Sequence, residues 1–138
     1  MSWTCPHCGA KFVTMRASHS CVRRTRADFF AGKPRGGVKH AKALIAEVQK
    51  FGPVTVHPVK TRIALMVDVR FAAINRIDDD SIRAHLWLRE QHVSDRFLRI
   101  EQLGARDWLY HFGVSDDEPI DRELRRFLRL AYDGGKRA

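Results

Sequence analysis

The stretch Ile63–Leu88, IALMVDVRFAAINRIDDDSIRAHLWL, decides the fold of this chain of 138 residues. Apolar residues occupy every second position over 63–69 and again over 82–88, and the residues over 71–76 continue the extended pattern. Such alternation is typical of strands that bury one face. Asp78–Asp80 is expected to form a polar turn. The stretch therefore predicts consecutive antiparallel strands.

The segments on either side complete an α+β pattern. Further strands are expected over 54–57, 98–103 and 107–114. Apolar residues at helical spacing predict helices over Val38–Phe51 and Glu118–Asp133, and Asp116 or Asp117 is expected to cap the second helix. Because the connections are short and no long helix interrupts the strands, we expect an antiparallel β-meander of about five to six strands flanked by two helices.

The composition divides the chain near residue 36. Lys33–Gly37 contains one proline and two glycines, which is typical of a linker. We therefore expect a zinc-binding appendage and linker over 1–36, followed by an α+β domain over 37–138.

The N-terminal segment holds the residues of a zinc site. The three cysteines all precede residue 22, and an odd number excludes a full disulfide framework. Three thiolates and one imidazole hold structural Zn²⁺ with no position left open for water. The spacing predicts one structural Zn²⁺ bound by Cys5, Cys8, His19 and Cys21. His7 is a rival for the imidazole ligand, and a redox Cys-x-x-Cys or unliganded thiols are the alternatives to zinc.

The charge balance is strongly basic. The chain has 25 Lys and Arg residues against 16 Asp and Glu residues, a net charge of +9. Such a balance favours polyanions such as nucleic acid, although a solubilising surface is the simpler interpretation. The chain shows no N-terminal signal segment. Its longest apolar run, Ile63–Val67, is far short of the roughly 18 residues that span a bilayer. We expect a soluble, cytoplasmic protein with no membrane partner.

Seven arginines are candidates for contact with nucleic acid: Arg23, Arg24 and Arg26 near the N-terminus, and Arg122, Arg125, Arg126 and Arg129 on the last predicted helix. The four on the helix fall on one stripe, and guanidinium groups match phosphate oxygens. In the alternative interpretation this stripe is a solvated face, supported by the ion pairs Glu118–Arg122 and Asp121–Arg125.

A second candidate surface lies on the predicted sheet. His85 and Trp87 alternate with the apolar residues of their strand, His111 is out of phase with the apolar residues of its own, and Lys60–Arg62 joins two β segments. Together these residues could line a shallow face that binds an anion or stacks a base. If the helices cover that face, the same rings belong to the core. The sequence has no recognised catalytic motif.

The chain resembles a bacterial family, domain of unknown function 5655. The motifs that carry the resemblance are Trp3–Gly9 with His19–Cys21, Asp28–Lys33, Gly52–Val54, Val59–Ala64, Trp108–His111 and Leu130–Tyr132. The resemblance implies a small α+β fold and an N-terminal metal site, and it implies no established activity. Related domains occur joined to nuclease-like proteins, which favours a nucleic-acid partner. The resemblance also makes Lys60, Thr61 and His111 the best candidates for a ligand site.

These observations favour a non-catalytic binding or adaptor module that contacts nucleic acid through its basic surface and carries a structural zinc site. One alternative is a domain that binds a protein partner through the zinc element, or a small anionic ligand at Lys60, Thr61, Arg62 and His111. Another is an enzyme that acts on an anionic substrate with Lys60, Arg62 and His111.

Overall fold

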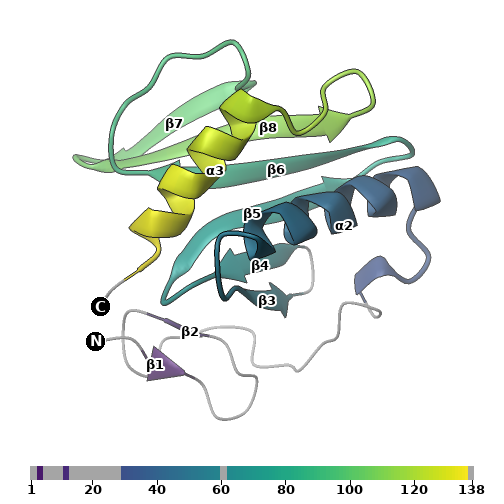
Figure 1. Ribbon diagram of the computed structural model, residues 1–138, viewed down its shortest axis with the longest axis horizontal. Helices are drawn as coiled ribbons and strands as arrows, with labels where there is room; N and C mark the ends of the chain where they lie inside the picture. The colour runs from purple at the N-terminus through teal and green to yellow at the C-terminus, as the bar shows by residue number, and fades with distance from the viewer. Residues whose placement is uncertain (1–2, 5–10, 13–28, 60–61, 137–138) are drawn as a thin grey trace.

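The computed structural model describes residues 3–4, 11–12, 29–59 and 62–136, and Figure 1 labels its elements. The helices are α2 (Arg35–Gln49) and α3 (Arg122–Gly134). A two-stranded ribbon consists of β1 (Trp3–Thr4) and β2 (Lys11–Phe12). The main sheet contains β3 (Thr55–Pro58), β4 (Ile63–Met66), β5 (Arg70–Ile77), β6 (Ser81–Leu88), β7 (Arg99–Gly104) and β8 (Asp107–Ser115).

The main sheet has six strands, all antiparallel, in the order β3-β4-β5-β6-β8-β7. The predicted α+β fold is therefore confirmed, with one departure from a simple meander. The chain leaves β6, crosses to the edge of the sheet to form β7, and returns as β8 between β7 and β6. This order places the long strands β6 and β8 side by side over their whole length.

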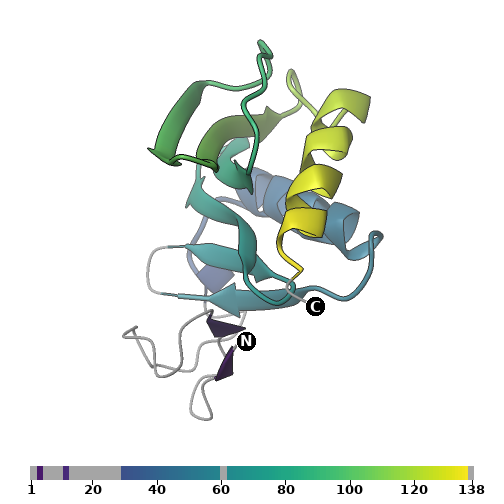
Figure 2. The ribbon, with the colours of Figure 1, turned by 90° about the vertical axis from the view of Figure 1, so that its left-hand side faces the viewer.

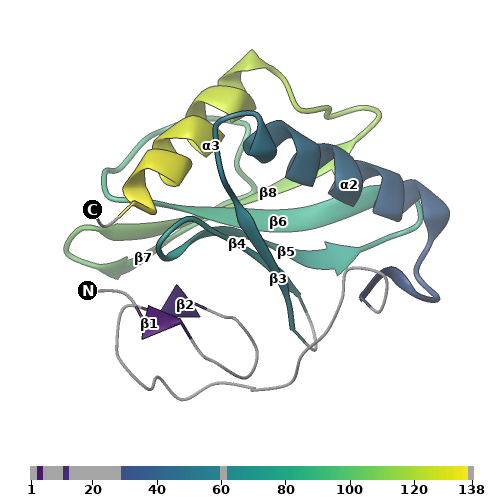
Figure 3. The same cartoon turned by 60° about the horizontal axis from the view of Figure 1, so that its bottom comes forward.

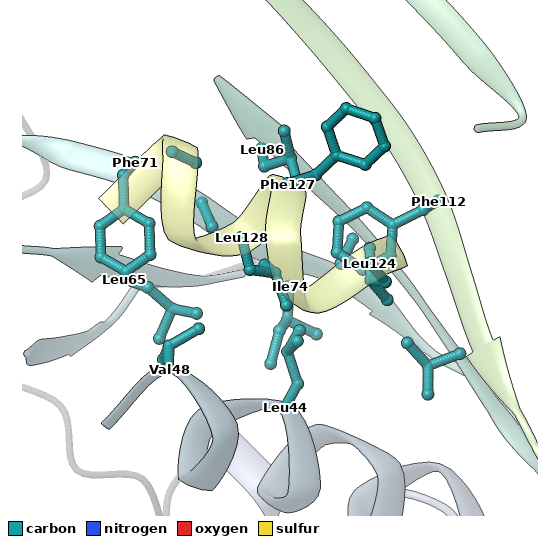
Figure 4. Close-up of a cluster of buried hydrophobic side chains, with 14 of the residues drawn as sticks. Leu44, Val48, Leu65, Phe71, Ile74, Leu86, Phe112, Leu124, Phe127 and Leu128 are labelled. Carbon is teal, nitrogen blue, oxygen red and sulfur yellow. The ribbon is translucent and has the colours of Figure 1, made fainter. Parts of the chain in front are cut away.

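Both helices pack against the same face of this sheet (Figures 1 and 2). Apolar side chains from α2, α3 and the facing positions of the strands fill the space between them, as Figure 4 shows for Leu44, Ile74, Leu86, Phe112 and Leu128. Each of these five is almost completely buried. In Figure 3 the β1–β2 ribbon lies on the other side of the sheet, away from the helices. No helix in the described ranges covers that second face.

The turn between β4 and β5 was not expected, because the alternating pattern over 63–76 predicts one continuous extended segment. The structure breaks it at Val67–Val69, where the backbone turns and β5 pairs back on β4. The turn contains neither glycine nor proline, so the sequence gives little sign of it. It is held by a distant segment, since the backbone N–H groups of Asp68 and Val69 both donate to the carbonyl of Gly135 at 3.1 Å.

The glycines at 36 and 37 belong to a helix and not to a linker. Helix α2 begins at Arg35, three residues earlier than predicted. A Cβ on Gly36 would lie 2.3 Å from the carbonyl oxygen of Asp79. The backbone N–H of Gly37 donates to that same oxygen at 3.1 Å. Glycine is therefore needed for close approach, and the Asp78–Asp80 turn is docked on the start of α2 instead of being merely solvated.

Helix α3 begins later than predicted. Its N-cap is Asp121, whose carboxylate accepts a hydrogen bond from the backbone N–H of Leu124 at 2.8 Å. Glu118 lies before the helix, and its side chain accepts from Arg96 at 3.4 Å. The aspartates at 116 and 117 are too far from the helix start to cap it. Because several acidic residues precede the helix, the sequence alone does not select the one that caps it.

Candidate functional site

One row of side chains crosses the second sheet face from edge to edge. The cross-strand register pairs them in order: His57, Ala64, Ala73, His85, His111 and Arg99. We call this set the histidine row. Over β3–β5 the row is largely buried, and over β8 and β7 it becomes partly exposed. His85 lies at the boundary and has only 4% of its surface exposed.

Hydrogen bonds fix the orientation of both central histidines. The amide nitrogen Nδ2 of Asn75 lies 2.6 Å from Nδ1 of His85. Nε2 of His111 lies 2.6 Å from Oε1 of Glu101. The two imidazole rings are 5.6 Å apart between centroids, and the Trp87 ring is 4.6 Å from His85.

Asn75 reaches His85 because of a β-bulge. The register between β5 and β6 shifts between Ile74 and Arg76, and this leaves Asn75 without a cross-strand partner. A bulge redirects the side chain of its extra residue. Here that side chain is placed beside the histidine that the regular register pairs with Ala73.

His85 presents a buried donor without a partner. Because the amide of Asn75 donates to Nδ1, the proton of the neutral ring is on Nε2. This Nε2 atom is buried and makes no hydrogen bond. A buried polar group left unpaired costs about 1–3 kcal/mol. Burial lowers the pKa of His85 to about 4, helped by the charges of His111, Arg62 and Arg70, so the ring is neutral near pH 7.

Two guanidinium groups, those of Arg62 and Arg70, act on His85 by their charge. Arg70 is exposed as a whole residue, yet the pKa of its guanidinium is lowered, first by partial burial and then by the charge of Arg62. In the part of the chain that the structure describes, neither arginine forms an ion pair with a carboxylate. Two like charges without a carboxylate partner, acting on a residue with an unpaired N–H donor, are an arrangement that favours an anion. We call Arg62, Arg70 and His85 the anion centre.

The charge of Glu101 also acts on His85, in the direction opposite to that of the two arginines, but the direct contacts of Glu101 are with other residues. Its carboxylate accepts a hydrogen bond from His111 and lies 3.4 Å from Arg99. The hydrogen bond from His111 is the main reason that the pKa of Glu101 is lowered, and Arg99 contributes to the same direction. Glu101 thus orients His111, and its contacts lie at the β7 end of the histidine row.

The arginine stripe on α3 makes structural contacts. Arg125 pairs with Glu47 of α2 at 2.8 Å, and Arg129 lies 3.5 Å from Asp133 and over the Phe51 ring. Arg126 stacks over Phe127. The pairs Glu118–Arg122 and Asp121–Arg125 that the sequence suggested are not formed, because the helix starts at Arg122 itself. Since α3 covers the first face of the sheet, this stripe and the anion centre lie on opposite sides of the sheet (Figure 2).

Most other predicted site residues lie outside the described residues. These are the zinc ligands Cys5, Cys8, His19 and Cys21, the rival ligand His7, the arginines Arg23, Arg24 and Arg26, and the ligand candidates Lys60 and Thr61. Within the described ranges, no group of three or more His, Cys, Asp or Glu side chains is arranged to hold a metal ion.

Of the predicted ligand residues, Arg62 and His111 are brought together on the second face. Strand alternation placed His85 and Trp87 on the same face, as observed. Sequence reasoning missed Asn75, Arg70 and Glu101. Asn75 is hidden by the bulge, Arg70 by the turn at Val67–Val69, and Glu101 by the unexpected position of β7 at the sheet edge.

The chain is thus a small α+β domain with one sheet face covered by helices and a second face that carries the histidine row. It belongs to the family described as domain of unknown function DUF5655, whose sequence model matches residues 26–134. No match was found among curated proteins or among solved structures. No helix in the described part of the chain is long and apolar enough to cross a membrane.

Proposed function

We propose that this domain binds single-stranded nucleic acid on its second sheet face, with a phosphate at the anion centre and a base against Trp87. The observation that carries the proposal is the buried, unpartnered Nε2–H of His85 together with two guanidiniums that act on this residue by their charge and have no carboxylate partner. A phosphate oxygen that displaces the atoms covering Nε2 would satisfy both the donor and the charges. Single strands are bound in general by basic surfaces combined with aromatic rings on which bases stack. The part of this face over β8 and β7 is partly exposed, which gives a strand access there.

Titration of the full-length protein with fluorescent single-stranded RNA and DNA tests this proposal. Because a charge-assisted hydrogen bond contributes about 1.5–3 kcal/mol, Arg62→Gln and Arg70→Gln should each weaken binding about tenfold or more. Each should also reduce the salt dependence by one phosphate contact, a change in slope of about 0.7.

Arg122→Gln is the matched control for these variants. It removes the same charge from an exposed residue on α3, and Arg122 forms no ion pair within the described residues. Its binding should stay close to that of the unchanged protein. If Arg122→Gln weakens binding as much as Arg62→Gln, the attraction is a property of net charge and the anion centre has no special role. Negligible binding at low salt removes the proposal altogether.

A second candidate function rests on the His111–Glu101 pair. A carboxylate at 2.6 Å orients the imidazole, as in many general acid–base catalysts. With Arg62 to bind a phosphate, His111 would transfer a proton during phosphodiester cleavage. The test is incubation of labelled RNA with the protein in the presence of a chelator. Product that disappears in His111→Gln supports this activity, and intact RNA with the unchanged protein refutes it.

We also propose a structural zinc site at Cys5, Cys8, His19 and Cys21. The donor set of three thiolates and one imidazole fits Zn²⁺. The antiparallel pairing of β1 with β2, in the register Trp3↔Phe12 and Thr4↔Lys11, supports it, because this ribbon flanks the Cys-x-x-Cys segment directly. Metal analysis of protein purified without chelator should give one zinc per chain, and Cys21→Ala should lose it. Protein without metal would contradict this proposal.

A further inference from the structure

A pocket opens beside the anion centre, where β5 begins and β6 ends. Its volume is about 430 Å³. That lies within the range of about 300–1,000 Å³ common for small-molecule sites. Its walls come from the start of β5, the end of β6 with the residues that follow it, and the C-terminal half of α3.

The buried Tyr110 fixes the backbone of the segment that follows β6 by hydrogen bonds. The hydroxyl of Tyr110 donates to the carbonyl of Glu90 at 2.9 Å and accepts from the backbone N–H of His92 at 2.7 Å. The His92 ring packs against Phe127 at 5.4 Å between centroids. Further along the same connection, the buried Arg96 donates to the carbonyls of Glu118 and Pro119. The pocket is therefore preformed and does not depend on a ligand to shape it.

The lining of the pocket suits a flat heterocycle. Trp87, Phe71 and Leu130 supply aromatic and apolar surface. Arg89 and Glu90 also line it, and neither forms an ion pair in the described part of the chain. A nucleobase needs these features together: a surface for stacking, with donors and acceptors for its edge.

The pocket and the anion centre share Arg70, and Trp87 connects the pocket to His85. Trp87 lines the pocket and touches the ring of His85, while Arg70 lines the pocket and acts on His85 by its charge. A ligand that fills both positions carries a phosphate next to a heterocyclic ring. We infer that the unit recognised is one nucleotide, with its phosphate at the anion centre and its base in the pocket. This inference rests on the proposed function and specifies its ligand.

Gly134 offers a direct test of the pocket. It lines the pocket, and a Cβ placed on it would meet no atom within 4 Å. There is thus room for the Cβ of a larger residue, and we expect Gly134→Leu to fill the pocket. Leu130→Trp fills it from the preceding turn of α3, at a position that is 41% exposed. It serves as the second variant if Gly134→Leu does not fold.

The probes are the four nucleoside 5′-monophosphates and ribose 5-phosphate, measured by calorimetry on the full chain. Because stacking of one base contributes about 1–3 kcal/mol, at least one monophosphate should bind about tenfold more tightly than ribose 5-phosphate. Gly134→Leu should remove this difference and leave the affinity for ribose 5-phosphate little changed. Gly134→Ala, a smaller addition at the same position, should keep most of it.

The outcomes separate this inference from the proposed function. If all five probes bind equally while single strands still bind in a manner sensitive to Arg62→Gln, the base pocket is refuted and the nucleic-acid face stands. The same conclusion follows if Gly134→Leu and Leu130→Trp leave the preference for a base unchanged. If neither the probes nor single strands bind, both proposals fail.

Discussion

His85 should make the domain less stable as the pH falls below about 6.5. In the folded chain its pKa is lowered from 6.5 to about 4, chiefly because the ring is buried and also because positive charges surround it. Between these two values the unfolded chain binds a proton that the folded chain does not, so stability rises with pH in this window. Each pKa unit corresponds to about 1.36 kcal/mol. Acidification through the window should therefore cost roughly 3 kcal/mol from this residue alone.

Urea unfolding of the unchanged protein and of His85→Gln, at intervals from pH 8 to pH 4, measures this contribution. The unfolding free energy of the unchanged protein, relative to that of His85→Gln, should be constant near neutral pH and fall steadily below about pH 6.5. The comparison cancels the titration of the other histidines, which both proteins share. Nitrogen-15 NMR of the imidazole should also show the proton on Nε2 at neutral pH, as the bond from Asn75 requires. A parallel pair of pH profiles, or a proton on Nδ1, would refute this account of His85.

Two further predictions concern the starts of the helices. Gly37→Ala should destabilise the domain by about 1–3 kcal/mol or more in urea unfolding, because its Cβ would lie in hard contact with the carbonyl oxygen of Asp78. An unchanged urea midpoint would mean that the Asp78–Asp80 turn is not docked on α2. Asp121→Ala should cost about 1 kcal/mol through loss of the α3 cap, whereas Asp117→Ala, at an exposed position before the helix, should change little. Equal effects of the two aspartate substitutions would contradict the assignment of the cap.

The sequence predicted the elements better than their connections. Alternation over Ser81–Leu88 correctly placed His85 on one face and Leu86 on the other, because the pleat of a strand depends on local backbone geometry. Both helices were predicted from the spacing of their apolar residues, and that spacing identified buried positions such as Leu44 and Leu128. These features need only local information and one buried face.

What the sequence missed depends on contacts between distant segments. The turn at Val67–Val69 is held by the carbonyl of Gly135. The bulge at Asn75 has no mark in the residue pattern, yet it determines which nitrogen of His85 carries the proton. The sequence of Gly36 and Gly37 is equally consistent with a linker and with a site where two backbones approach closely. Only the docking of the Asp78–Asp80 turn on these glycines distinguishes the two interpretations.

The placement of β8 between β6 and β7 has a consequence for the order in which the strands pair during folding. The strands from β3 to β6 join neighbours along the chain, but β6 and β8 meet only after the intervening segment has closed a loop. Closing that loop is an entropic cost that local hairpins do not carry. We therefore expect His85 and His111 to come together late in folding, so that a nascent or partly unfolded chain lacks the surface that we propose for a phosphate.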